Sequence, residues 1–134
     1  MNIKPCIFCE MDPARVIARE GPCYAVYDGF PVSIGHILII PNRHVASFRE
    51  LTEEEWIAVH KLANELSNQL RERDKTIDGF NLGINDGEAA GQTIFHVHVH
   101  LIPRRKGDVE NPRGGVRHVI PCRGFYPAST EPER

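Results

Sequence analysis

The stretch Thr93-Ile-Phe-His-Val-His-Val-His-Leu-Ile-Pro103 decides the fold, because histidine and apolar residues alternate through its centre. A period of two predicts a β-strand, in which successive side chains point to opposite faces. We therefore expect a strand over residues 93–102 that the following proline stops. His96, His98 and His100 then share one face, at intervals of roughly 6.6 Å, and the residues between them face a core.

Three imidazoles on one strand face indicate a functional site. Each imidazole has a pKa near neutrality and can serve as a metal ligand, a nucleophile or a proton carrier. A solvent-facing polar side of the strand is the alternative interpretation, but Thr, Lys or Glu would serve that purpose equally well. Convergent titratable groups are typical of functional sites, so we interpret the run as an active site.

The remaining pattern predicts one long helix and several strands. Thr52 and Glu55 form a capping box at the start of a helix over residues 52–73, along which apolar residues recur at three-four spacing. We also expect strands over residues 23–27, 36–41 and 78–84. A short turn or helix is expected over residues 11–16, and a short strand over residues 116–120. Helices combined with hairpin-like strands and short turns favour an α+β fold with an antiparallel sheet.

Composition limits the class of protein. The chain has 134 residues, of which 41% are hydrophobic and 25% charged, and its formal net charge is −2. These values are typical of a globular domain and show no overall bias toward nucleic acid or membranes. The N-terminus lacks the apolar region of a signal peptide and no apolar run could span a bilayer, so we expect a cytoplasmic protein. One domain is expected over residues 1–126, followed by a frayed tail over residues 127–134.

Cys6 and Cys9 form a Cys-x-x-Cys pair close to the N-terminus. In a reducing compartment such a pair is more often a metal or redox site than a structural disulfide. A thioredoxin-like redox pair lies at a strand-to-helix turn, and no strand precedes Cys6. The pattern therefore favours metal binding over redox chemistry.

The histidine run resembles the signature of the histidine triad (HIT) family of nucleotide hydrolases and transferases. The flanks match as well: Gln92-Thr93 precedes the run, Pro103-Arg104 follows it, and upstream lie Asp28, His36, Ile39-Ile40-Pro41, His44 and Asn85-Asp86-Gly87. The similarity extends from Cys6 to about Arg117. It implies a HIT-like α+β fold with about five antiparallel strands and two helices, assembled as a homodimer.

The resemblance also implies roles for the histidines. His98 would be the nucleophile that attacks the α-phosphorus and forms a nucleotidyl-histidine intermediate. One of its ring nitrogens must stay unprotonated, so the other needs a hydrogen-bond acceptor, which the family supplies from a backbone carbonyl. His100 and His36 would bind the phosphate oxygens as charge develops there.

Further residues match the family's substrate-binding positions. Asp28 would accept both ribose hydroxyls, although an aspartate before a glycine is also a common turn-former. Phe8 and Phe30 are candidates for the base pocket, or else core residues. The polar residues that would contact the phosphate and the leaving group are Asn85, Gln92 and Thr93.

In family members that keep the cysteine pair, the corresponding residues complete a zinc site. The resemblance therefore implies a structural Zn²⁺ bound by Cys6, Cys9, His44 and His96. Four protein ligands leave no open position for chemistry. A nucleic-acid-binding zinc finger is disfavoured because the two histidines lie far apart in sequence, and no sequence-specific nucleic acid partner is expected.

The segment from Gly107 to Arg117 resembles microbial members close to the fragile-histidine-triad, dinucleoside-polyphosphate branch. A hydrolase of purine dinucleoside polyphosphates, such as diadenosine tetraphosphate, is therefore the first functional hypothesis. Arg113 and Arg117 are candidates to meet a long polyphosphate. The alternatives are a nucleotidyl transferase or phosphorylase, a phosphoramidate hydrolase, and a nucleotide-binding regulatory protein with little catalysis.

Overall fold

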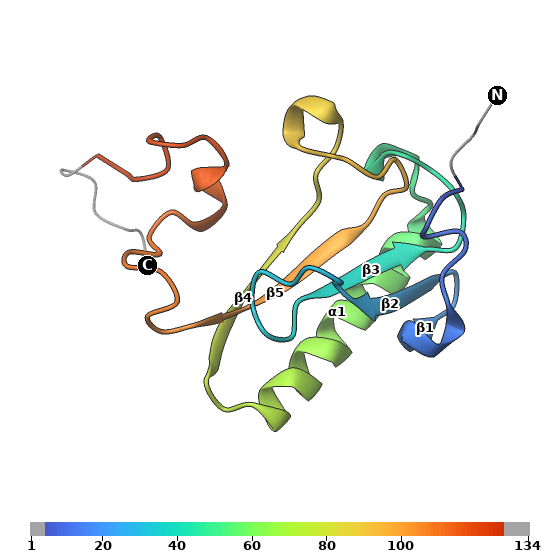
Figure 1. Ribbon diagram of the computed structural model, residues 1–134, viewed down its shortest axis with the longest axis horizontal. Helices are drawn as coiled ribbons and strands as arrows, with labels where there is room; N and C mark the ends of the chain where they lie inside the picture. Colours follow the sequence, from blue (N-terminus) through green and yellow to red (C-terminus); the bar gives the residue numbers. More distant parts are fainter. Residues whose placement is uncertain (1–4, 128–134) are drawn as a thin grey trace.

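A computed structural model describes residues 5–127 and shows a five-stranded antiparallel sheet with the strand order β1-β2-β3-β5-β4. The strands are β1 (Val16–Glu20), β2 (Cys23–Tyr27), β3 (Ile37–Pro41), β4 (Ile77–Gly83) and β5 (Val99–Arg105). One α-helix, α1 (Glu53–Arg73), runs along one face of this open sheet (Figure 1). The α+β class and the five-stranded antiparallel sheet are as predicted.

Helix α1 forms where the capping box predicts it. Thr52 accepts from the backbone N–H of Glu55, and the Glu55 carboxylate accepts from the backbone N–H of Thr52. Its apolar stripe packs on the sheet through Ala58, Val59, Leu62, Leu66 and Leu70. This packing buries the face of the sheet that carries the odd-numbered residues of β3 and β5.

The opposite face of the sheet carries the site. Leu38 and Ile40 of β3 belong to a second core cluster on this face, together with Phe8 of the N-terminal segment. Because side chains alternate along a strand, His36 before β3 and His100 in β5 point to this face too. The N-terminal segment covers only part of it, which leaves room for a cavity beside the histidines.

The predicted strand over 93–102 is wrong at both ends, since β5 begins at Val99 and continues past Pro103. Over residues 93–98, one backbone–backbone hydrogen bond, from the Val97 N–H to the Val45 carbonyl, takes the place of a strand ladder. Pro103 is tolerated because β3 pairs with β5 only as far as Leu101, so no ladder bond is required from position 103 on that side.

Three further features differ from the prediction. The short turn or helix expected over residues 11–16 is the 3-10 helix Pro13–Arg15, so the described residues contain one α-helix where the resemblance implied two helices. The expected strand over 116–120 is a 3-10 helix, Gly115–Val119. Strand β1 was not predicted, because no apolar alternation marks it.

The C-terminal segment, residues 106–127, leaves β5 and stands beyond the β4 edge of the sheet (Figure 1). An ion pair between Arg104 and Asp108, with Nε to Oδ2 at 2.8 Å, fixes its start. Apart from Pro127, the tail predicted to fray lies outside the described residues. Over residues 5–127, no helix has the length and apolarity needed to cross a membrane.

Candidate active site and metal centre

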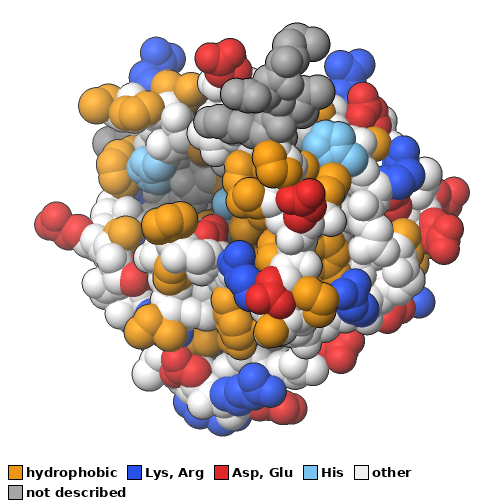
Figure 2. All heavy atoms as spheres, turned by 45° about the vertical axis from the view of Figure 1, so that its right-hand side comes forward, with side chains coloured by type: hydrophobic (Ala, Val, Ile, Leu, Met, Phe, Trp, Pro, Cys, Tyr) orange, Lys and Arg blue, Asp and Glu red, His pale blue; other side chains and the backbone are white. Residues whose placement is uncertain are grey.

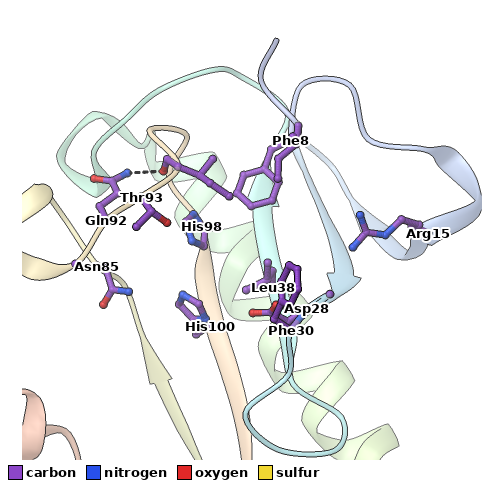
Figure 3. A pocket seen from close by; sticks show the side chains of 14 residues that line it. Phe8, Arg15, Asp28, Phe30, Leu38, Asn85, Gln92, Thr93, His98 and His100 are labelled. Carbon is purple, nitrogen blue, oxygen red and sulfur yellow. Dashed lines mark hydrogen bonds between the residues drawn. The ribbon is translucent and has the colours of Figure 1, made fainter. Parts of the chain in front are cut away.

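His98 lies at a cavity of about 310 Å³ on the open face of the sheet, and Figure 3 shows its ring between Phe8 and His100. The cavity also contains most of the residues predicted to bind substrate. Its lining includes Phe8, Asp28, Phe30, Asn85, Gln92, Thr93, His98 and His100. Residues that come from five separate parts of the chain are thus brought together at one place.

A backbone carbonyl fixes the tautomer of His98. Its Nδ1–H donates to the His96 carbonyl at 2.9 Å, which is the hydrogen bond expected from the resemblance. The Nε2 atom of the neutral ring therefore carries the lone pair. The edge of the Phe8 ring packs against His98, with ring centroids 5.0 Å apart, and restricts its rotation.

His36 and His100 form a directed hydrogen-bond chain. The Val32 N–H donates to His36 Nδ1 at 3.2 Å, so a neutral His36 carries its proton on Nε2. That proton is donated to His100 Nδ1 at 2.9 Å. His100 is consequently protonated on Nε2, a buried atom that has no partner among the described residues. The chain thus ends in an unused donor within the site.

Burial keeps both histidines neutral. Desolvation, together with the neighbouring His98 and His36, lowers the pKa of His100 to about 4. Desolvation also lowers the pKa of His36, against the opposing effect of the Asp28 carboxylate, whose Oδ2 lies 3.4 Å from His36 Nε2. Both rings can therefore act as neutral donors near pH 7.

Asp28 forms the predicted turn and also lies at the cavity. One carboxylate oxygen accepts from the Phe30 backbone N–H at 2.8 Å, which is the turn-forming contact. The residue also lines the cavity beside Phe30, whose side chain is 92% exposed. The other aromatic candidate, Phe8, is a buried core residue with one edge on the cavity, so the two phenylalanines differ in character.

The three polar candidates are not equivalent. Gln92 is buried, and its amide is occupied by bonds to the Gly87 N–H and to the carbonyls of Ala46 and Ile94. It shapes the loop that closes one side of the cavity. Asn85 and Thr93 are exposed at the cavity wall, where their polar groups can meet a ligand.

Arg15 lines the same cavity and was missed by the sequence analysis. Figure 3 shows its guanidinium on the far side of the cavity from His98. It donates to the Tyr27 carbonyl at 3.4 Å. A single arginine in a segment without periodicity gives no signal from which this position could have been predicted.

Cys6, Cys9, His44 and His96 come together as a candidate metal centre, with their four ligand atoms within 4.8 Å of one another. The Nδ1 atoms of His44 and His96 are 3.2 Å apart, and Cys9 Sγ lies 3.2 Å and 3.5 Å from them. A tetrahedral zinc site with ordinary bond lengths has ligand–ligand edges of about 3.3–3.8 Å. The four residues therefore fit a tetrahedral ion.

The tautomer of His96 also suits a metal. Its Nε2–H donates to the Pro41 carbonyl at 2.7 Å, so Nδ1 presents its lone pair to the cluster. The ring is fully buried, and desolvation lowers its pKa, which favours the neutral form that a metal ligand requires. The possible ligand atoms of Asp28, His36 and His100 also lie within 4.8 Å of one another. There, however, the hydrogen bond between the two imidazoles accounts for the close approach.

The protein is thus a small α+β domain with a run of histidines beside a cavity of about 310 Å³. Residues 10–107 match the HIT domain, and the chain belongs to the HIT family. It is 41% identical over 88 residues to a bis(5'-adenosyl)-triphosphatase of Dictyostelium discoideum, covering 66% of this chain and 58% of that protein. It is 36% identical over 107 residues to adenylylsulfatase HINT3 of Arabidopsis thaliana, covering 77% and 54%.

Solved structures agree with the family. A Zn-bound histidine triad family protein from Mycobacterium smegmatis superposes with a TM-score of 0.70 at 34% identity, covering 77% of each chain. The predicted family and fold are thereby confirmed.

Proposed function

We propose that the protein hydrolyses the bond between the α-phosphorus of a purine nucleotide and its leaving group through a nucleotidyl intermediate on His98. One observation carries the proposal: the bond from His98 Nδ1 to the His96 carbonyl leaves the Nε2 lone pair available at the cavity. A neutral imidazole attacks an anionic phosphate without charge repulsion. It also divides one difficult displacement into two easier ones.

In the first step, Nε2 of His98 forms a bond to the α-phosphorus, and the bond from phosphorus to the leaving group breaks with its electron pair going to that group. In the second step, water attacks the phosphorus, the bond between phosphorus and Nε2 breaks with its electron pair returning to Nε2, and the proton lost by water passes to the solvent. The products are the nucleoside 5'-monophosphate and the free imidazole. Inorganic phosphate in place of water would give the nucleoside diphosphate, which is the phosphorylase alternative.

The surrounding groups suit the other parts of such a substrate. His100, protonated on Nε2 by the chain from His36, supplies a preorganised donor for the phosphate oxygens. The free acceptor capacity of the Asp28 carboxylate fits a ribose diol. Phe30 and the edge of Phe8 offer apolar surface to a purine base.

Diadenosine tetraphosphate remains the first substrate proposed, and nucleoside phosphoramidates the second. The names of the triphosphatase and adenylylsulfatase relatives support a purine nucleotide with a good leaving group on its α-phosphate. The mixture of basic and acidic side chains in Figure 2 fits the small net charge, so local groups must bind the phosphate.

We further propose that Cys6, Cys9, His44 and His96 bind a structural Zn²⁺, supported by their geometry and by the zinc-bound relative. The ion would fix the N-terminal segment to the chain that enters β5, and four ligands leave it no part in the chemistry. Free thiols at Cys6 and Cys9 suit the cytoplasm. A homodimer is proposed from the family resemblance.

Trapping the intermediate tests the function. Enzyme mixed with excess diadenosine tetraphosphate or the morpholidate of AMP, and quenched in denaturant, should gain the mass of one adenylyl group on His98. His98→Asn should show neither adduct nor turnover, whereas His60→Asn, an exposed histidine on α1, should show both. An active His98→Asn variant, or a wild-type enzyme that consumes neither substrate, would overturn the proposal; the second result favours a nucleotide-binding protein.

A further inference from the structure

Arg15 brings a cation to the cavity that contains His98. Among the described residues that line this cavity, Arg15 and Asp28 are the only ones of the Lys, Arg, Asp and Glu types. The Asp28 carboxylate lies 3.4 Å from His36, and no ion pair joins it to Arg15 within residues 5–127. The cavity therefore contains a guanidinium that its own acid does not neutralise.

Two other arginines show how unusual this is in the described chain. Arg105 makes an ion pair of 2.9 Å with Asp74. The guanidinium of Arg117, a candidate to meet a polyphosphate, lies 4.2 Å from the centre of the Tyr126 ring. Arg15 instead makes one long hydrogen bond, of 3.4 Å, to a backbone carbonyl. Because a guanidinium has five N–H donors and no acceptor, most of the donors of Arg15 are available to a ligand.

The sheet register places Arg15 beside the proposed ribose-binding residue. Val16, the first residue of β1, pairs with Val26 of β2. Arg15 therefore lies next to the chain that leads from β2 into Asp28. A Cβ atom added at Gly29 would lie 3.7 Å from Nη2 of Arg15. A long side chain at position 29 would thus compete with the guanidinium for space, and glycine leaves that space to it.

The proposed site residues give the cavity a direction. Figure 3 shows His98 on one side, Asp28 beyond it, and the guanidinium of Arg15 on the side farthest from His98. Phosphate, ribose and base follow one another in a nucleotide, so a phosphate at His98 and a ribose at Asp28 direct the base toward Arg15. The other labelled side chains in this part of the cavity are apolar: Phe8, Phe30 and Leu38. The guanidinium is consequently the charged group that the base would meet.

We propose that Arg15 is a specificity-determining residue that binds the edge of the base and favours the 6-oxopurines, guanine and hypoxanthine, over adenine. The inference rests on the proposed function and narrows the purine that it accepts. The donors of a guanidinium form a rigid fork. O6 and N7 of a 6-oxopurine are adjacent acceptors that such a fork binds together, whereas adenine has a donor amino group beside N7. Adenine nucleotides remain substrates, with one of the two bonds missing.

The morpholidates of GMP, IMP and AMP test this preference, because they share the ribose, the phosphate and the leaving group. We expect wild-type enzyme to favour GMP and IMP over AMP by about tenfold in kcat/KM, near the low end for a bidentate contact to a base. Arg15→Leu should bring the three values together, with the larger losses on GMP and IMP. Arg15→Lys keeps the charge without the fork and should lose most of the preference. Arg15 is exposed, so neither change should disturb folding.

Arg19→Leu is the matched control, since Arg19 is an exposed arginine of β1 that does not line the cavity; it should keep the preference. Equal wild-type values on the three morpholidates would overturn the inference, while their turnover would leave the proposed function standing. Consumption of none of the three would overturn both.

Two results with the Arg15 variants would also overturn the inference. Equal losses on all three morpholidates in Arg15→Leu would mean that the guanidinium binds a group common to them. A loss confined to diadenosine tetraphosphate would assign it to a distal phosphate. Full retention of the preference in Arg15→Lys would show that a point charge suffices and that no fork reads the base.

Discussion

His96 and His98 lie two residues apart, yet backbone carbonyls hold opposite nitrogens of the two rings. His96 donates from Nε2 to the Pro41 carbonyl and presents Nδ1 to the cysteine cluster. His98 donates from Nδ1 to the His96 carbonyl and presents Nε2 to the cavity. The same residue type is thus prepared as a metal ligand at one position and as a nucleophile at the next.

The third histidine of the run completes the comparison. His100 accepts on Nδ1 from another imidazole, His36, so it presents a donor rather than a lone pair. In each ring one nitrogen is held by a hydrogen bond, and the partner of that bond decides whether the other nitrogen offers a lone pair or a proton. Burial does not distinguish the three roles, since all three rings are largely enclosed. Substitutions that separate these roles therefore test the comparison directly.

The largest expected effect is on turnover at position 98. His98→Asn should lower kcat by at least about 10³-fold, because the covalent route is lost, while thermal unfolding stays near that of the wild type. His96→Asn should show the opposite pattern, with a lower unfolding temperature and a smaller loss of turnover measured well below that temperature. Steady-state assays and calorimetry on both variants would decide. If the two variants lost kcat and unfolding temperature to the same extent, the proposed division of roles between His96 and His98 would be wrong.

The donor chain is expected to contribute the next largest effect. His36→Leu removes the Nε2–H that orients His100, and kcat should fall about 10²-fold, as on loss of a preorganised donor. His36→Gln retains an N–H and should recover part of the rate. KM should change less than kcat in both, because the effect acts on developing charge. Equal rates for the two variants would contradict the directed chain.

Loss of the metal bound by His96, at the start of the histidine run, should lower the stability of the protein. Cys9→Ser should lower the free energy of unfolding by about 2 kcal/mol or more, since loss of a metal site is among the large single-residue effects. The variant should also lose zinc, measured by elemental analysis of the purified protein. Cys122→Ser is the control, as Cys122 is likewise an exposed free thiol but lies in the C-terminal segment. Zinc retained by Cys9→Ser would contradict the proposed ligand set.

Much of this arrangement could be predicted from local pattern. The alternating run placed three imidazoles together, and Thr52 with Glu55 marked the start of α1 correctly. The limits of β5 could not be predicted, because Pro103 is acceptable only where β3 no longer pairs with β5, and that depends on the tertiary structure. The resemblance predicted the residues that gather in the cavity. The 3-10 helix Gly115–Val119 stands where a strand was predicted, because the sequence there has no periodicity that distinguishes the two.

The smallest effect should come from the ion pair between Arg43 and Glu55, which lies beside the proposed metal centre. Arg43 donates to the buried Glu55 carboxylate at 2.8 Å, next in sequence to His44. This hydrogen bond is the main reason that the pKa of Glu55 lies below its usual value, assisted by bonds from Thr52. Glu55→Gln should therefore lower the free energy of unfolding at pH 7 by about 1 kcal/mol.

The pH dependence of that difference identifies its cause. A carboxyl whose pKa is lower in the folded state stabilises the protein above its unfolded pKa, and the contribution is lost as pH falls through the folded pKa. Urea unfolding of wild type and Glu55→Gln should therefore show a constant gap from pH 7 to about 5 that closes below about pH 4. Turnover should be the same in both proteins, since Glu55 contacts Arg43 beside the metal ligand His44 and does not line the cavity that contains His98. A gap that persists in acid would mean that packing, and not charge, holds this end of the molecule.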